Sequence, residues 1–222
     1  NCSCGVSARS IASPAIPESL SSSASFSLIL SSGFVPSYNY YDDLYGRNRW
    51  KFSNIYSLSI GQGELLVTPL QMANLAAIIA NRGIYYTPKI AIEIDGKKVI
   101  NQTRINTDID INHYNYIIDA MEDAVKLGSA RRGYMNDIIL CGKTSTVQNP
   151  HGYDHSGFIG FAPKEKPKIA ISSYIENAGQ GGRAAVSIAS LAVEYYINNG
   201  IKRKWLETYV LLGDFIDEED TE

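Results

Sequence analysis

The sequence predicts an α+β fold in which antiparallel strands form a sheet with helices packed on it. Three apolar runs, at residues 138–147, 156–162 and 168–177, are separated by short, turn-rich segments. Parallel neighbours need a crossover of a dozen or more residues, so these short connections favour an antiparallel meander. Helical patterns precede and follow the three runs, and this order is typical of a sheet covered by buried helices.

The first helix is predicted to begin at Thr68 and to end before Gly83. Thr68 is a suitable N-cap with Gln71 three residues later, and Pro69 occupies the first helical position. The residues that follow are apolar almost all round. That pattern is expected of a buried helix rather than of one lying on the surface.

Three further elements are indicated before and after the apolar runs. Residues 87–94 alternate as a short strand, and Asp95-Gly96 is a hairpin turn signal before residues 98–100. Two more helices are predicted at residues 112–127 and 183–198, where apolar side chains recur at helical spacing. Each is expected to end at a glycine, Gly128 and Gly200 respectively.

Composition excludes some classes of function. The chain has 222 residues, 45% of them hydrophobic and 19% charged, enough to bury the core of one domain or most of one. A formal net charge of -3 argues against a nucleic-acid partner. The three cysteines are too few for a disulfide framework, and their spacing is weak evidence for metal. We expect neither a cofactor nor a bound metal.

The chain divides by composition into three parts. Residues 1–33 are rich in serine and contain Pro14 and Pro17, which predicts a linker or a disordered segment. Residues 34–216 carry the helix and strand signals. Residues 217–222 form an acidic tail that is expected to be solvated. No apolar run reaches the roughly 20 residues of a membrane-spanning helix, so no anchor is predicted in this chain.

The most informative stretch is Cys141 to Gln148, a predicted strand that carries a lysine and two threonines. An ammonium group and hydroxyls on one strand can together hold a carboxylate, because charge-assisted hydrogen bonds are the strong ones. Lys143, Thr144 and Thr146 are therefore candidate binding residues. The alternative is a strand in which the threonines serve β propensity alone.

Several ordered motifs resemble the class B penicillin-binding proteins of the cell-elongation type. The resemblance runs from about Gly33 to Ile216 in the family's order and spacing. It is carried by Ser57-Leu58-Ser59-Ile60-Gly61-Gln62-Gly63-Glu64, Thr68-Pro69-Leu70-Gln71-Met72-Ala73-Asn74, Asn81-Arg82-Gly83, Gly142-Lys143-Thr144, Asp154-His155, Phe161-Ala162-Pro163, Pro167-Lys168-Ile169-Ala170 and Glu176-Asn177. Residues 1–33 do not match.

The resemblance implies a partial transpeptidase fold, like that of β-lactamases, and the activity of a peptidoglycan D,D-transpeptidase. Such an enzyme cross-links stem peptides in the bacterial cell wall through a serine acyl-enzyme, and β-lactams acylate the same serine. It implies as partners the stem peptide, β-lactam antibiotics and a membrane-embedded glycan polymerase of the elongation machinery. The implied location is the periplasmic face of the inner membrane.

The resemblance assigns unequal roles to the strand residues. Lys143 would supply positive charge for the substrate carboxylate and for proton transfer around the serine. Thr144, Ser145 and Thr146 would bind substrate, and the Thr146 backbone N–H would contribute to an oxyanion hole. The family's nucleophile lies in a Ser-x-x-Lys motif, and no such motif occurs in the 222 residues.

Two features depart from a simple match. Ser145 stands where the family has glycine, and a side chain there would intrude on the space of a ligand or a neighbouring backbone. Gln148, Asp154 and His155 are expected at the cleft rim or in a structural role, in preference to a zinc site that would include His151.

Two functions therefore remain open at this point. The first is the C-terminal part of a transpeptidase whose serine half is absent from this chain. The second is a non-catalytic family member that keeps the strand as a binding or scaffold module. In either case we expect an exposed sheet edge and exposed apolar helix faces, and hence marginal stability or self-association of the chain in isolation.

Overall fold

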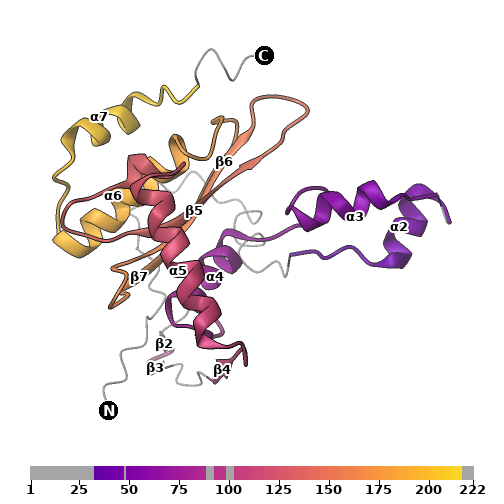
Figure 1. Cartoon of the computed structure of the whole chain (residues 1–222), viewed down its shortest axis with the longest axis horizontal. Coiled ribbons are helices and arrows are strands. Elements are labelled where there is room, and N and C mark those ends of the chain that lie inside the picture. The colour runs from indigo at the N-terminus through magenta and orange to yellow at the C-terminus, as the bar shows by residue number, and fades with distance from the viewer. Residues whose placement is uncertain (1–32, 48, 89–92, 99–102, 217–222) are drawn as a thin grey trace. The chain divides into compact units, whose positions relative to one another are not determined.

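The computed structural model describes residues 33–216, except residues 48, 89–92 and 99–102 (Figure 1). Most of the predicted linker (1–33), part of the predicted strand at 87–94 and the acidic tail (217–222) therefore lie outside the described residues. The described chain falls into two compact units, which divide between Gln71 and Met72. Each unit is considered by itself below.

The first unit contains two short helices that the sequence patterns did not reveal. α2 (Tyr38–Tyr45) is capped by Ser37, whose hydroxyl accepts a hydrogen bond from Tyr40 N at 3.2 Å. α3 (Phe52–Ser59) follows. Glu64 accepts hydrogen bonds from the hydroxyls of Tyr41 (2.9 Å) and Tyr45 (2.5 Å). Burial, and then the bond to Glu64, raise the pKa of Tyr41 to about 12.

α4 (Pro69–Ala80) begins as the sequence predicts, with Pro69 as its first residue. Its capping box is formed by two reciprocal bonds. Thr68 N donates to Gln71 Oε1 at 2.8 Å, and Gln71 N donates to Thr68 Oγ1 at 3.2 Å. Gly83 follows the helix with a φ of 93°. The predicted end of this helix is confirmed, because this backbone region favours glycine.

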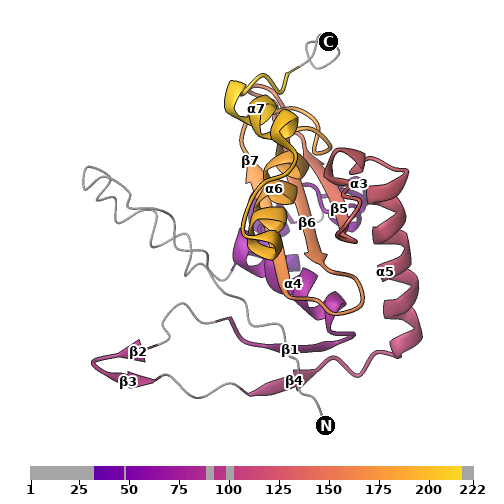
Figure 2. The same cartoon turned by 90° about the vertical axis from the view of Figure 1, so that its left-hand side faces the viewer.

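The second unit is built around an antiparallel sheet with the strand order β5-β6-β7 (Figure 2). The strands are β5 (Cys141–Val147), β6 (His155–Ala162) and β7 (Ile169–Ile175). Lys143 pairs with Ile159 and Ser145 with Gly157. The predicted α+β class and the antiparallel meander are both confirmed. β5 and β7 begin three residues and one residue later than their apolar runs, and β6 begins one residue earlier than its run.

Two small strand pairs complete the second unit. β1 (Ile84–Tyr86) pairs with β4 (Arg104–Asn106), and neither was predicted. β2 (Glu93–Ile94) pairs with β3 (Lys97–Lys98) through the predicted turn. Asp95 and Gly96 have φ values of 49° and 73°, as that tight turn requires.

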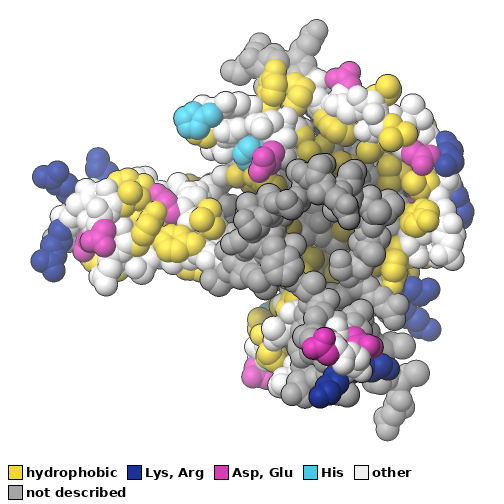
Figure 3. Space-filling model, turned by 180° about the vertical axis from the view of Figure 1, so that it is seen from behind, with side chains coloured by type: hydrophobic (Ala, Val, Ile, Leu, Met, Phe, Trp, Pro, Cys, Tyr) yellow, Lys and Arg dark blue, Asp and Glu magenta, His cyan; other side chains and the backbone are white. Residues whose placement is uncertain are grey.

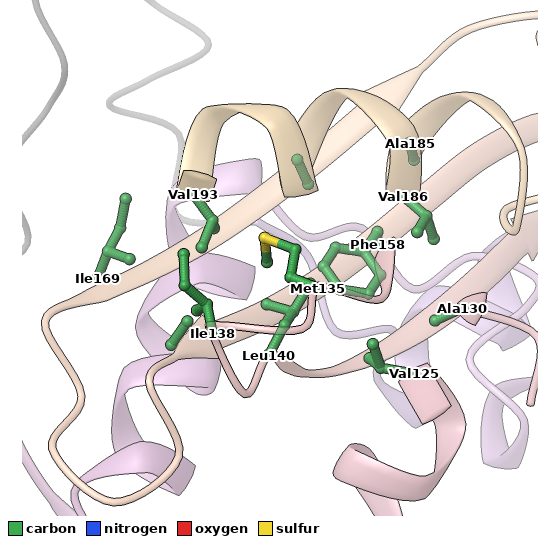
Figure 4. Close-up of a cluster of buried hydrophobic side chains, with 12 residues drawn as sticks. Val125, Ala130, Met135, Ile138, Leu140, Phe158, Ile169, Ala185, Val186 and Val193 are labelled. Atoms are coloured by element: carbon green, nitrogen blue, oxygen red, sulfur yellow. The ribbon is translucent and has the colours of Figure 1, made fainter. Parts of the chain in front are cut away.

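Helices cover both faces of the β5-β6-β7 sheet. α5 (Ile111–Lys126) and the end of α4 place Ile118, Met121 and Ala80 against Cys141 and Phe161. α6 (Ala184–Asn198) packs on the opposite face, where Figure 4 shows Phe158 beneath the helix among Ala185, Val186, Val193, Leu140 and Met135. Alternate residues of a strand point to opposite faces, which accounts for this division.

The end of α6 differs slightly from its prediction. The helix begins at Ala184, one residue later than predicted, and ends at Asn198 as predicted. The residue that stops it is Asn199, with a φ of 54°, rather than Gly200. Asparagine tolerates the left-handed region better than most residues do, so it can take the position usually filled by glycine.

α7 (Lys204–Leu212) was not predicted, and it is held to α6 by a buried ion pair. Arg203 Nε donates to Glu194 Oε2 at 2.9 Å, and the backbone N–H of Lys202 donates to Glu194 Oε1 at 3.0 Å. Glu194 is 1% exposed, so these bonds satisfy a carboxylate that burial would otherwise disfavour. In the described ranges, none of the helices combines the length and the apolar character that crossing a membrane requires.

Candidate functional site

The candidate site lies on β5, which pairs with β6 and is an edge strand among the described residues. Cys141 is fully buried against α5, and the alternation of the strand puts Lys143 and Ser145 on the same face as Cys141. Thr144 and Thr146 point to the face covered by α6. The expected binding residues are therefore adjacent on one strand, but their side chains are divided between its two faces.

Lys143 is exposed, and its ammonium group folds back on its own strand. Nζ donates to the carbonyl oxygen of Thr144 at 2.7 Å. This bond uses one of the three hydrogens of the ammonium group. The cation is thereby held beside the strand edge and keeps donors for a second partner.

Thr144 is buried, with 8% of its surface exposed, and its hydroxyl bonds to another hydroxyl. Ser129 Oγ and Thr144 Oγ1 are 2.7 Å apart, and either atom can be the donor. Ser129 is exposed and lies between α5 and the short 3-10 helix η1 (Arg131–Gly133). The sequence patterns did not single out Ser129.

Thr146 is exposed and contacts the turn that precedes α6. Gly181 N donates to Thr146 Oγ1 at 3.2 Å. The turn lies so close to the sheet that a Cβ on Gly181 would be 2.1 Å from the carbonyl oxygen of Ser145. Glycine is required there for the close approach of two backbones, which the sequence alone did not reveal.

Ser145, at the position where the sequence resemblance leads us to expect glycine, directs its hydroxyl toward the neighbouring strand. A Cβ on its partner Gly157 would lie 2.1 Å from Ser145 Oγ. The serine hydroxyl therefore occupies space that the absence of a side chain at Gly157 leaves open. The intrusion predicted from the sequence is directed, at least in part, at the sheet itself.

Asp154 stabilises the turn between β5 and β6, and His155 at the start of β6 binds the segment that follows β7. Asp154 Oδ1 accepts from Asn149 N at 3.1 Å. His155 Nδ1 accepts from Asn177 N at 3.0 Å, and its ring lies 5.6 Å from that of Tyr174. Gln148 and His151 are exposed. Within the described part of the chain, no three His, Cys, Asp or Glu side chains are grouped as metal ligands would be.

A charged cluster adjoins the start of β5. Glu122 on α5 forms ion pairs with Lys126 and with Lys164, the latter at 2.5 Å. The hydrogen bonds from Lys126 and then Lys164 hold the pKa of the Glu122 carboxyl below its ordinary value. Burial raises the pKa of the Cys141 thiol to about 12, and the negative charge of Glu122 adds to the effect. This cluster ties α5 to the β6–β7 connection.

Comparison with known proteins shows which family this chain resembles. A family profile described as the penicillin binding protein transpeptidase domain matches residues 41–194, more than half of the chain. The peptidoglycan D,D-transpeptidase MrdA of Acinetobacter baumannii is 30% identical over 171 residues, which cover 68% of this chain and 25% of MrdA. The peptidoglycan D,D-transpeptidase PbpA of Mycobacterium tuberculosis is 29% identical over 155 residues, 61% of this chain and 30% of PbpA.

Solved structures confirm the partial transpeptidase fold. PBP2 of Pseudomonas aeruginosa is 27% identical with a TM-score of 0.64, over 79% of this chain and 41% of that one. An imipenem acyl-enzyme complex of penicillin-binding protein A from Mycobacterium tuberculosis is 26% identical with a TM-score of 0.55, over 64% of this chain and 33% of that one. The chain spans less than half the length of each relative. It belongs to the penicillin-binding protein transpeptidase family and is similar to the elongation-type MrdA and PBP2 members.

Proposed function

We propose that this chain is the carboxylate-binding part of a peptidoglycan D,D-transpeptidase. The observation that carries the proposal is the edge strand β5, where the ammonium group of Lys143 is held against the Thr144 carbonyl oxygen and Thr144 and Thr146 supply hydroxyls from the same strand. A stem peptide ends in a carboxylate, and an ammonium group and hydroxyls are suitable donors for it. The names of MrdA and PbpA support the reaction class.

The chemistry proposed for the whole enzyme is acyl transfer in two steps. A serine outside these 222 residues attacks the penultimate D-alanine carbonyl, and the terminal D-alanine leaves as an amine that takes up a proton. The amine of a neighbouring stem peptide then attacks the ester and restores the serine. In this scheme Lys143 stabilises the negative charge of the substrate, and the Thr146 backbone N–H contributes to the oxyanion hole.

The proposed partners and location follow from the same role. The chain would act on stem peptides at the periplasmic face of the inner membrane, together with a membrane-embedded glycan polymerase of the elongation machinery. β-Lactams would bind at the same strand, because they too carry a carboxylate beside a reactive carbonyl. The imipenem acyl-enzyme formed by penicillin-binding protein A of Mycobacterium tuberculosis supports this last point by similarity.

The direct test is to measure the affinity of the 222-residue chain for N-acetyl-D-alanyl-D-alanine by NMR titration. We expect Lys143→Met to weaken binding about tenfold or more, because a charge-assisted hydrogen bond contributes roughly 1.5–3 kcal/mol. Lys166→Met removes the same charge from the exposed β6–β7 turn and should leave binding unchanged. Equal affinities for the wild type and Lys143→Met would overturn the proposal.

A non-catalytic binding module is the second candidate, and the hydroxyl of Ser145 against Gly157 favours it. Fluorescent penicillin distinguishes the two functions when applied to this chain and to the protein encoded by its full-length gene. Labelling of the full-length protein alone supports the enzyme, and labelling of neither supports the binding module.

A further inference from the structure

The pair of hydroxyls formed by Ser129 and Thr144 suggests a binding residue beyond those on β5. Thr144 is 8% exposed, whereas Ser129 is an exposed residue, and their oxygens are 2.7 Å apart. The hydroxyl of the buried Thr144 therefore has its hydrogen-bond partner within this chain. Ser129 is the exposed residue of the pair.

Hydrogen-bond direction gives this arrangement a chemical consequence. Each hydroxyl has one hydrogen to donate and two lone pairs to accept with, while an ionised carboxylate can only accept. A carboxylate beside Ser129 would receive the Ser129 hydrogen, and Thr144 would then donate to Ser129. Bonds in such a chain polarise one another, so the buried threonine would strengthen the donor at the surface.

The backbone around Ser129 is held from two sides. Ala130 N donates to the Ala124 carbonyl at 2.9 Å, which ties the segment to the end of α5. A Cβ on Gly182 would lie 2.5 Å from the Ser129 carbonyl oxygen, so the turn before α6 contacts Ser129 directly. The preceding residue of that turn, Gly181, is the donor to Thr146. The α5–η1 segment, β5 and this turn thus bring Ser129, Thr144 and Thr146 together.

We infer that Ser129 is a specificity-determining residue of the carboxylate site, and that Thr144 acts through it. The inference rests on the proposed function, because it assigns a further donor to the same ligand group. Its chemistry predicts discrimination between a free carboxylate and a C-terminal amide. A neutral amide gains less from a polarised hydroxyl donor than a carboxylate does.

The test uses NMR titration to measure the affinity of the 222-residue chain for N-acetyl-D-alanyl-D-alanine and for the C-terminal amide of the same dipeptide. We expect Ser129→Ala to lower the affinity for the carboxylate three- to tenfold and to leave the affinity for the amide unchanged. Ser129→Thr, which keeps the hydroxyl, should restore the wild-type value. Thr144→Val should add little once Ser129 is alanine, because residues that act as a pair are not additive.

The outcomes separate this inference from the proposed function. If Lys143→Met weakens carboxylate binding and Ser129→Ala does not, the role of Ser129 is wrong and the proposed function stands. If neither variant changes carboxylate binding, the proposed function and the role of Ser129 are both wrong. An equal loss for carboxylate and amide in Ser129→Ala would show a purely structural role and would also overturn the inference. Amide spectra of each variant without ligand establish that the fold is intact.

Discussion

At the scale of single residues, β5 contains groups whose environments differ sharply although they are neighbours in the chain. Lys143 and Ser145 are exposed, and Thr144 between them is buried. The sequence identified these three residues and Thr146 as candidates. It did not identify Ser129 or Gly181, because their bonds to Thr144 and Thr146 join residues 15 and 35 positions apart. Nothing in a local pattern reports such contacts.

Cys141, the first residue of β5, is expected to be unreactive in the folded protein. Burial raises its pKa to about 12, and the thiolate is the nucleophile, so iodoacetamide at pH 8 should scarcely modify it. Unfolding in guanidinium should restore the reactivity of an ordinary thiol. Mass spectrometry of the peptide that contains Cys141 measures both rates. Equal rates in the folded and unfolded protein would contradict the buried position.

At the scale of elements, whether the sequence predicted a helix or strand depends on how that element is stabilised. The three strands, α4, α5 and α6 have long apolar patterns or capping signals, and these were predicted. α2, α3 and α7 are only 8 or 9 residues long. Isolated helices of that length are marginal, so tertiary contacts decide whether they form. The bonds of Glu64 to two tyrosines and of Glu194 to Arg203 are such contacts.

The contact between α5 and the β6–β7 connection should depend on pH through Glu122. Its pKa is lower in the folded state, so its stabilisation is present above the unfolded value of ~4.3 and is lost as the pH falls through the folded value. Glu122→Gln should therefore lower the free energy of unfolding by about 1–3 kcal/mol at pH 7. The difference from the wild type should disappear in acid.

Urea unfolding at pH 7 and at acidic pH measures this effect. Glu207→Gln is the matched control, because Glu207 pairs with the exposed Lys204 on the surface of α7. Exposed ion pairs contribute little, so this variant should stay close to the wild type at both pH values. A Glu122→Gln deficit that persists unchanged in acid would show that the loss is one of packing and not of charge.

At the scale of the whole molecule, the described chain exposes several large apolar side chains. Figure 3 shows apolar groups on the surface of the segment that carries α2 and α3. On and just after α3, Phe52, Tyr56 and Ile60 recur at intervals of four residues and are 77%, 60% and 64% exposed. Residues at that spacing share one side of a helix, so they form a continuous apolar strip. Exposed strips of this kind mark contact surfaces.

We expect the 222-residue chain to self-associate through this strip. Sedimentation velocity should show a larger average mass as the concentration rises, and a Phe52→Ser, Tyr56→Ser double variant should remain monomeric over the same range. Tyr116→Ser changes an equally exposed aromatic residue on α5 and should behave like the wild type. A wild-type chain that stays monomeric at all concentrations would contradict this expectation.

The sequence by itself determined the α+β class, the antiparallel meander, the three long helices and the cation and hydroxyls of β5. These follow from periodicity, capping residues and residue chemistry, which are properties of short stretches of chain. Tertiary structure decided which hydroxyl is buried and which is exposed, where the side chain of Ser145 points, and that Ser129 and the Gly181-Gly182 turn adjoin the candidate site. Those features depend on contacts between residues far apart in the chain, and packing alone brings such residues together.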